Sequence, residues 1–354
     1  MPDSSKKPAG SEMSMETRLL LAFGLMGLVL FASQYFLPKP APPPQKKAEP
    51  VEVQVKVAGA GEQSAAPKAP AAAPSKAAAP VQPSSERVVA EKEETHILET
   101  SVYRIVFSNR GAVIRSWVLK KYRDSSGNPV ELVNAIAAPK AGWAYSYVFP
   151  REKPAKDLNT ALFAVSQPDP LTVEFRYDDG ATRALKRFRF EQDRYRGQFL
   201  SEVASQGRPV EHHLAWRGGF GDKTVHNPTG VQKTVYYDAA KQKLVEEGVH
   251  SPDKGPITTS GAFHFAGIED TYFAAVALPR GESGIEFTAW SDPVAETEGG
   301  EEKPHAGVSL GGRAVNEWTF FVGPKDTDIL RSTDRKLETM IDWGWFWFIA
   351  KPLF

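Results

Sequence analysis

Alternation of apolar and polar residues dominates the middle of the chain. It is clearest in two neighbouring runs, LTVEFRY at 171–177 and ATRALKRFRF at 181–190, which an Asp-Asp-Gly sequence separates. A period of two is typical of half-buried β-strands, and an Asp-Gly turn between two such runs indicates a hairpin. Residues 171–190 are therefore predicted to form an antiparallel β-hairpin.

The same alternation recurs at short intervals up to residue 324. Runs at 102–107 (VYRIVF) and 112–119 (AVIRSWVL) flank an Asn-Arg-Gly turn and predict a second hairpin. Further strands are predicted at 199–204, 212–216, 234–237, 243–247, 263–265, 272–278, 285–291 and 316–322. Because no helical run longer than two turns separates them, residues 96–324 are predicted to form a mainly β domain, a large β-sandwich.

The apolar period changes after residue 324. The positions that share one helical face are Ile329, Leu330, Leu337, Met340 and Ile341. Asp326 and Asp328 suit the positive N-terminal end of a helix. One amphipathic helix over 325–342 is therefore predicted to close the β domain.

An uncharged run near the N-terminus predicts a membrane anchor. Residues 19–37 (LLLAFGLMGLVLFASQYFL) would form a helix about 30 Å long, which matches the hydrocarbon layer of a bilayer. Cleavage after Ala32 would place Leu30 at −3, a poor match to a signal-peptidase site, and a lipoprotein signal would need a Cys. A transmembrane helix that follows polar residues 1–18 is therefore expected.

The region after this run is rich in Pro and Ala. Residues 38–95 are predicted to be an extended linker, because repeated Pro blocks helices and removes strand donors. A P-x-x-P docking ligand is the alternative. Three Lys or Arg residues lie on each side of the apolar run, so the positive-inside rule leaves its orientation open.

The last twelve residues, 343–354, are dense in aromatic side chains. The residues predicted to lie at a membrane interface are Trp343, Trp345, Phe346, Trp347, Phe348 and Phe354. Trp suits that position because its ring is apolar while its N–H stays hydrated. An aromatic lid on the β domain is the alternative. Because the chain stops inside an apolar run, we expect the N-terminal portion of a longer membrane protein.

Composition excludes several classes of function. The chain has 43 Lys and Arg against 43 Asp and Glu, which argues against a general nucleic-acid binder. The absence of Cys excludes disulfide scaffolds, thiol catalysis and cysteine-based zinc sites. No cofactor is expected.

Two motifs suggest ligand binding but depart from the required pattern. RGGFGDKT at 217–224 resembles a phosphate-binding loop, yet Asp222 separates Gly221 from Lys223, so an ordinary loop between strands is predicted. His212 and His213 are adjacent on a predicted strand and would point to opposite faces, so they cannot chelate one metal together. The other histidines considered, His226, His250 and His264, have no His partner at ligand spacing. No metal site is expected.

Polar side chains elsewhere do not single out a catalytic pair. The candidate acids and bases are Glu202, Glu211, Asp270 and His264, and no catalytic residue is expected among them. A cluster of basic residues lies in the predicted strand 181–190 and just after it. Its members are Arg183, Lys186, Arg187, Arg189, Arg194 and Arg196. A solvated strand face is predicted for them, with contact to anionic lipid headgroups or to an acidic partner surface as the alternative.

The order of these segments resembles the N-terminal part of a YidC-type membrane protein insertase of Gram-negative bacteria. The most specific stretch is residues 321–354, FVGPKDTDILRSTDRKLETMIDWGWFWFIAKPLF, which is similar to that family's junction between periplasmic domain and membrane core. Residues 108–122 (SNRGAVIRSWVLKKY) and 267–279 (GIEDTYFAAVALP) also resemble it. Residues 125–260 match only in their β character.

The resemblance implies a galactose-mutarotase-like β-sandwich in the periplasm, a cytoplasmic N-terminus and a location in the bacterial inner membrane. Residues 343–354 would begin an amphipathic helix on the periplasmic membrane face. The family inserts and folds membrane proteins, alone or with the Sec translocon, so nascent membrane proteins and the lipid bilayer are the expected partners. Its hydrophilic groove would lie beyond Phe354, and no residue of this chain is assigned to it.

Two other classes of function remain open from the sequence. One is a membrane-anchored periplasmic carbohydrate-binding or aldose-epimerase-like protein, which would need convergent acids in a pocket. The other is a structural adaptor of the envelope held by a tether.

Overall fold

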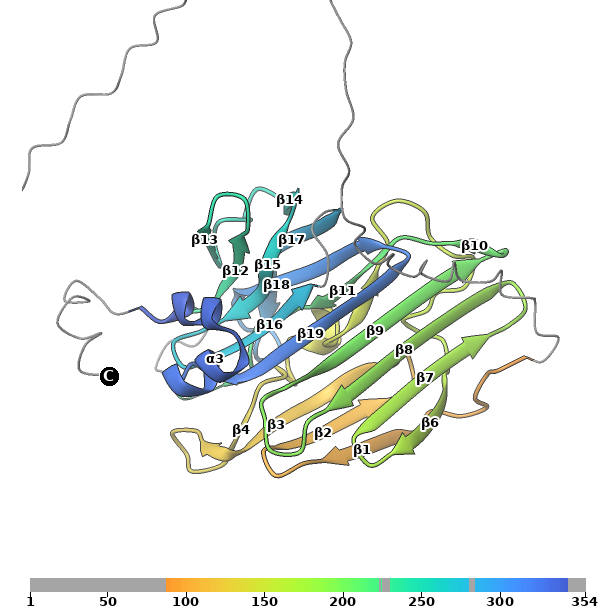
Figure 1. Cartoon of the computed structure of the whole chain (residues 1–354), viewed down its shortest axis with the longest axis horizontal. Coiled ribbons are helices and arrows are strands. Elements are labelled where there is room, and N and C mark those ends of the chain that lie inside the picture. Colours follow the sequence, from red (N-terminus) through yellow and green to blue (C-terminus); the bar gives the residue numbers. More distant parts are fainter. Residues whose placement is uncertain (1–86, 223, 225–229, 280–283, 343–354) are drawn as a thin grey trace, which may run out of the picture. The chain divides into compact units, whose positions relative to one another are not determined.

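Strands dominate the computed structural model, which describes residues 87–342 except 223, 225–229 and 280–283. They form three antiparallel sheets (Figure 1). The first sheet has the order β1 (Thr95–Glu99), β2 (Tyr103–Ser108), β3 (Val113–Arg123) and β4 (Pro129–Glu131). The second has the order β14 (Ile257–Gly261), β17 (Ile285–Ala295), β18 (Glu302–Arg313), β11 (His212–Trp216) and β5 (Ser146–Val148).

The third sheet has ten strands and is the largest. Its order is β13 (Lys243–Gly248), β12 (Lys233–Asp238), β15 (Phe263–Glu269), β16 (Phe273–Pro279), β19 (Val315–Pro324), β9 (Arg196–Ser205), β8 (Thr182–Phe190), β7 (Thr172–Asp178) and β6 (Ala164–Asp169), and β10 (Arg208–Pro209) pairs with β9. Three short helices complete the described chain: α2 (Ala138–Ala141), α3 (Thr327–Thr333) and the 3-10 helix η1 (Arg335–Met340).

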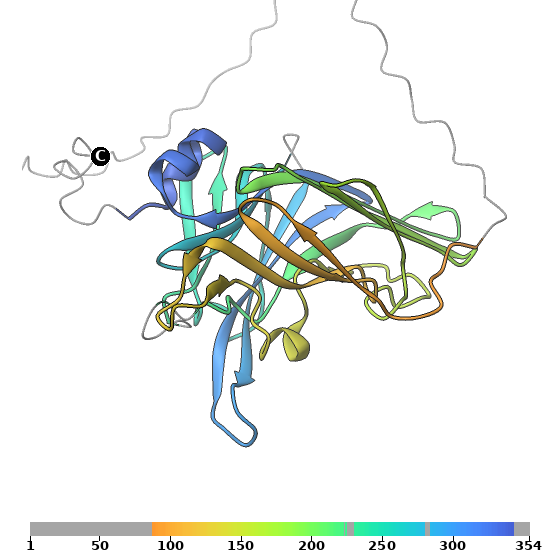
Figure 2. The same cartoon turned by 90° about the horizontal axis from the view of Figure 1, so that it is seen from below.

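The ten-stranded sheet packs against both smaller sheets, so the fold is a sandwich. Trp117 on β3 contacts Phe320 on β19 with ring centroids 5.7 Å apart and Trp216 on β11 with centroids 6.1 Å apart. The ten-stranded sheet meets the five-stranded sheet at Tyr236 on β12 and Phe287 on β17, whose ring centroids are 5.0 Å apart. Both views show β1–β3 lying across β7–β9 (Figures 1 and 2). The predicted mainly β sandwich is confirmed.

Local turn chemistry explains why the strongest hairpin prediction is correct. β7 and β8 pair in register from Thr172 opposite Arg189 to Asp178 opposite Arg183. In the turn, the Asp179 carboxylate accepts hydrogen bonds from two following backbone N–H groups, and Gly180 has φ +92°. Gly tolerates this left-handed conformation, which most residues avoid. The predicted pairing of β2 with β3 is also present.

The longest strand of the described chain is one that the alternation pattern does not predict. β18 runs for 12 residues (EKPHAGVSLGGR), and ten of its residues pair with β17. Figure 2 shows the light-blue ends of this hairpin projecting beyond the other strands. Gly and Pro are depleted in strands in general, so only the cross-strand pairing identifies this segment as β. The further strands absent from the prediction are β1, β4, β5, β6, β10 and β14.

The single amphipathic helix predicted over 325–342 is divided in two. α3 ends and η1 begins at Asp334, whose backbone is extended with φ −161°. The Asp334 carboxylate accepts a hydrogen bond from the Lys336 N–H at 2.8 Å, so it caps the second helix and ends the first. Asp326 caps α3 in the same way. Of the predicted apolar face, Leu330, Leu337 and Met340 are buried.

The hydrogen bonding of the β domain begins inside the range predicted as linker. Val88 and Asp178 exchange two backbone hydrogen bonds of 2.8 Å, and the Ala90 N–H donates to the Leu162 carbonyl at 3.2 Å. Within the described residues no helix has the length and apolarity needed to cross a bilayer. The predicted anchor, residues 19–37, lies outside them.

Candidate functional site

The residues predicted to lie at a membrane interface fall outside the described part of the chain. They are Trp343, Trp345, Phe346, Trp347, Phe348 and Phe354. The structure does describe the segment directly before them, residues 325–342, which we call the helical junction. The candidate functional site is therefore the set of contacts that attach the helical junction to the β domain.

Polar contacts fix the middle of the helical junction to the ten-stranded sheet. The His264 ring on β15 lies 3.0 Å from the Asp334 carboxylate, between α3 and η1. The Lys336 ammonium donates to the Tyr237 hydroxyl on β12 at 3.1 Å and lies 5.0 Å from the centre of the Tyr237 ring. Together with buried Leu330 and Leu337, these contacts hold both helices on strands β12 and β15.

A buried ion pair fixes the near end. The Lys325 ammonium lies 3.1 Å from Glu269 and also donates to the Asp270 carbonyl at 2.9 Å, while the Lys325 N–H donates to the Tyr272 carbonyl at 2.7 Å. Glu269 and Asp270 are only 2% and 4% exposed. The first residue of the helical junction is therefore tied to the turn between β15 and β16.

Burial sets the proton affinity of both carboxyls in this turn. It raises the pKa of Glu269 to about 7, although the Lys325 charge acts in the opposite direction. Burial also raises the pKa of Asp270 to about 6, against the hydrogen bonds from the Phe273 and Tyr272 N–H groups. Both carboxyls at the base of the helical junction therefore keep their protons to a higher pH than exposed carboxyls do.

The candidate acids and bases from the sequence lie in separate surroundings. Asp270 belongs to the turn below the helical junction, and His264 pairs with Asp334. Glu211 is exposed and pairs with Arg151 at 2.8 Å, whereas Glu202 is an exposed residue of β9. General acid–base catalysis needs two groups converging on one substrate, and the structure does not bring these four together.

The two adjacent histidines bind different partners. His212 lies 2.8 Å from the Ser201 hydroxyl, and burial lowers its pKa to about 4. His213 lies 3.1 Å from the Ser309 hydroxyl and 3.3 Å from Glu286, and burial lowers its pKa also. Ser309 is only 1% exposed, so this Ser–His–Glu series is closed to a substrate. Among the described residues no group of three His, Asp or Glu could hold a metal ion.

One member of the predicted solvated basic face is buried. The outward residues of β8 form ion pairs: Arg183 lies 2.8 Å from Asp178, and Arg187 lies 2.6 Å from Glu174. Lys186 lies on the other face of β8, and its side chain is 0% exposed. For Lys186 the prediction is wrong, because an even-numbered residue of β8 points into the sandwich, as Ala184 and Phe188 do.

Three backbone carbonyls surround the buried Lys186 ammonium. It donates to Gly111, Ala112 and Tyr145 at 3.0, 3.1 and 2.6 Å, and it lies 3.8 Å from the centre of the Tyr147 ring. Burial lowers the Lys186 pKa well below its ordinary value. This desolvation opposes the charged form, but the three carbonyl acceptors match the three N–H groups of a protonated amine and favour it, so we assign Lys186 as a structural cation.

The loop that resembles a phosphate-binding motif is held by an acidic residue. The Arg217 guanidinium lies 3.0 Å from Asp292 and 4.4 Å from the centre of the Trp290 ring. The Asp292 carboxylate also accepts from the Gly218 N–H at 3.1 Å. The Asp292 carboxylate thus takes up the donors of Arg217 and Gly218 that a bound phosphate would need. This agrees with the prediction of an ordinary loop between strands.

Comparison with known proteins matches the described domain to one family. A family model described as the YidC periplasmic domain matches residues 96–354. Relatives named "Membrane protein insertase YidC" include one from Geobacter metallireducens, 28% identical over 360 residues, and one from Syntrophus aciditrophicus, 27% identical over 370 residues. Each alignment covers 96% of this chain, but only 63% and 64% of the relatives. The chain therefore spans less than two thirds of their length.

A solved structure of similar fold is a galactose mutarotase-like protein from Lactobacillus casei. It is 11% identical, with a TM-score of 0.45, over 65% of this chain and all of that protein. The family match covers most of the chain and includes the β-sandwich together with the helical junction. The chain belongs to the YidC periplasmic domain family.

Proposed function

We propose that this chain is the anchored periplasmic part of an insertase that inserts and folds proteins of the bacterial inner membrane. The match of residues 96–354 to the YidC periplasmic domain supports this function, as does the name that its relatives carry. The proposed partners are the lipid bilayer, nascent membrane proteins and the Sec translocon.

The proposed topology follows the segments of the sequence. Residues 1–18 lie in the cytoplasm, residues 19–37 cross the inner membrane, and residues 38–95 carry the β domain into the periplasm. Residues 343–354 lie along the periplasmic membrane surface. The uncharged run at 19–37 and the three Trp of the last segment support this assignment.

The proposed role of the β domain is to position rather than to catalyse. The helical junction carries this proposal, because contacts at its first residue and at its middle, Asp334 and Lys336, fix it to the ten-stranded sheet shortly before residue 343. A rigid connection of this kind makes the domain and the following segment move together. We further propose that the sandwich is of the galactose-mutarotase type without sugar chemistry, which the separation of Glu202, Glu211, Asp270 and His264 supports.

Depletion of the full-length protein in its host tests the insertase function. We expect a small single-span membrane protein to remain uninserted, as measured by its accessibility to protease added to spheroplasts. Restoring the wild-type gene should recover insertion. Normal insertion during depletion would contradict the proposal, and saturable binding of a monosaccharide in calorimetry would favour the carbohydrate-binding alternative.

A further inference from the structure

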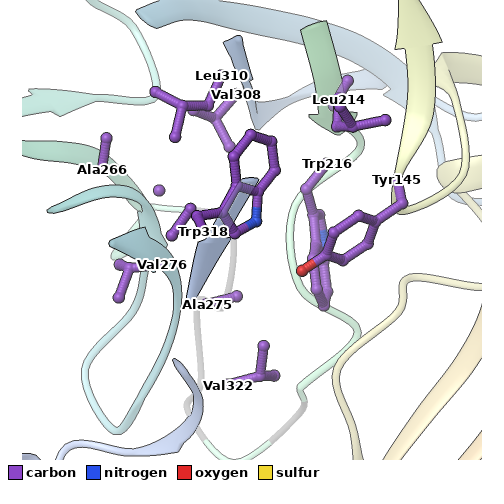
Figure 3. Close-up of a pocket in the computed structure, with 13 residues that line it drawn as sticks. Tyr145, Leu214, Trp216, Ala266, Ala275, Val276, Val308, Leu310, Trp318 and Val322 are labelled. Carbon is purple, nitrogen blue, oxygen red and sulfur yellow. The ribbon is translucent and has the colours of Figure 1, made fainter. Parts of the chain in front are cut away.

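The space between the ten-stranded and five-stranded sheets is too small for a peptide. Figure 3 shows Tyr145, Trp216 and Trp318 close together there. The space beside these rings measures about 50 Å³. A polypeptide segment that joins this part of the domain therefore has to bind at its surface, where the edges of the sheets offer backbone donors and acceptors.

Strand β1 is an open edge of the four-stranded sheet (Figure 1). The Glu94 carbonyl just before β1 and the Thr100 N–H just after it both bond to the β2 side. Successive residues of a strand direct their backbone groups to opposite sides. The residues whose N–H and C=O groups point away from β2, where β1 has no strand partner among the described residues, are therefore Thr95, Ile97 and Glu99.

This edge carries an apolar side chain that is open to solvent. Ile97 is 51% exposed, the highest value among the large hydrophobic residues of the described chain, and it lies opposite Val106 on β2. Edge strands are normally protected by Lys, Pro, bulges or shortness. β4 and β5 have three residues each, β6 contains Pro168 and a register shift, β13 begins with Lys243, and β14 exposes no large hydrophobic residue. β1 (THILE) has no Lys, Pro or register shift, so it is the edge best suited to another strand.

A run with the pattern of a strand precedes the β domain. Residues 51–57 read VEVQVKV, with Val at every odd position and Glu, Gln and Lys between them. Strict alternation of β-branched and polar residues is typical of a strand with one buried face. The Pro- and Ala-rich sequence on both sides has no such period. Four Val side chains left in water would favour aggregation, so this run needs a partner strand.

We propose that residues 51–57 add to β1 as a fifth strand of the four-stranded sheet. Their backbone would bond to the open edge of β1, and their Val side chains would extend the apolar row that Ile97 forms with Val106. In such an addition the backbone hydrogen bonds provide affinity, while alternate side chains provide specificity.

The connecting chain is long enough for this pairing. Residues 58–86 span up to about 90 Å when extended at 3.1 Å per residue. The described chain begins near β1, since Val88 and Thr95 are at most about 25 Å apart at 3.6 Å per residue. Docking would leave residues 38–50, about 40 Å long at 3.1 Å per residue, as the free tether between the predicted anchor and the domain. It would therefore limit how far the β domain moves from the membrane.

The absence of Cys makes disulfide trapping a direct test. In the purified full chain, Ile97→Cys is combined with a second Cys at each position from 51 to 57 in turn, and disulfide formation is followed on non-reducing gels. Side chains directly opposite each other on neighbouring strands have Cβ atoms about 5 Å apart, whereas the next residue faces the other side. We expect the fastest cross-linking at one odd position and several-fold slower cross-linking at the even positions beside it.

Ala72→Cys combined with Ile97→Cys is the matched control. Position 72 is nearer to β1 along the chain than position 53, so random collisions would favour a cross-link at position 72. Docking reverses this order. Equal rates at odd and even positions, or faster cross-linking at position 72, would overturn the proposal. Cross-links formed only between two chains would also overturn it, because the edge would then bind a second copy.

Hydrogen exchange gives a second test that leaves Ile97 in place. In the wild type the Ile97 amide should exchange slowly, and Val55→Pro, which removes a donor from the added strand, should accelerate it at least about tenfold. The His96 and Leu98 amides, which face β2, should not change, and Ala72→Pro should leave all three amides unaffected. Fast exchange of Ile97 in the wild type would overturn the proposal. Neither test depends on insertion activity, so failure of the proposed function would be seen separately.

Discussion

The ammonium of Lys186 lies 2.6 Å from the carbonyl oxygen of Tyr145, a residue in the left-handed backbone region. Its two other acceptors, the carbonyls of Gly111 and Ala112, also belong to residues with positive φ, +76° and +50°. One buried side chain on β8 thus stabilises the turn between β2 and β3 and the segment before β5. These contacts connect all three sheets through a single charge.

Replacement of Lys186 by Met should destabilise the domain strongly. The variant keeps the aliphatic volume but leaves three buried carbonyls without their donor, at a cost of about 2–5 kcal/mol in the free energy of unfolding. Chemical denaturation followed by Trp fluorescence measures this loss. Arg189→Met, on the exposed face of the same strand, is the matched control and should change stability by less than about 0.5 kcal/mol. Equal losses in the two variants would show that Lys186 has no special role.

Glu269 should make the domain less stable as pH rises from 4.5 to 7. Its pKa is raised in the folded state to about 7, so the folded state binds the proton more tightly than the unfolded state over this range. Glu269→Gln should therefore reduce the loss of unfolding free energy across this range by up to about 3 kcal/mol. The exposed Glu302→Gln variant serves as control. An unchanged pH profile in Glu269→Gln would contradict this.

His212 should have the opposite effect on the acid side. Its folded pKa is lowered to about 4, so between pH 6.5 and 4 the unfolded state binds more protons than the folded state, and stability decreases as the pH is lowered. The measurement is the difference in unfolding free energy between pH 7 and pH 4. In the His212→Gln variant this difference should be smaller by up to about 3 kcal/mol. His250→Gln, at an exposed histidine, should keep the wild-type acid profile.

Asp334→Ala should loosen the helical junction without unfolding the sandwich. The substitution removes the cap of η1 and the partner of His264, with an expected cost of about 1 kcal/mol. Hydrogen exchange should accelerate at the amides of α3 and η1 and stay unchanged in β8. If the junction positions the following segment, the same variant in the full-length protein should also reduce insertion of the small membrane protein.

A control for this experiment lies in α3 of the same helical junction. Asp328 has a side chain 91% exposed and only a distant ion pair of 3.7 Å with Arg331, so Asp328→Ala should affect exchange and insertion less. If Asp334→Ala reduced insertion without faster hydrogen exchange at η1, the proposal that Asp334 acts by holding the helical junction in place would be contradicted.

Local signals in the sequence are sufficient for the hairpins. Alternation and Asp-Gly chemistry predict β7 and β8, because strand phase and turn conformation depend on neighbouring residues. The cap at Asp334 also depends on neighbouring residues. It was not predicted, because the apolar period of residues 325–342 continues across Asp334 and indicates a single helix. Residues 19–37 and 343–354 remain predictions, since they lie outside the described chain.

Local patterns in the sequence are enough to predict the β character of the domain, its principal hairpins and, through residues 321–354, its resemblance to a family. They do not predict that Lys186 is buried among three carbonyls or that Lys325 is tied to Glu269, which the packing of the sheets shows. These partners lie far apart along the chain, since Lys186 binds carbonyls 41 to 75 residues away. Strand phase shows that a side chain points inward, whereas the groups that it meets there depend on how the sheets pack.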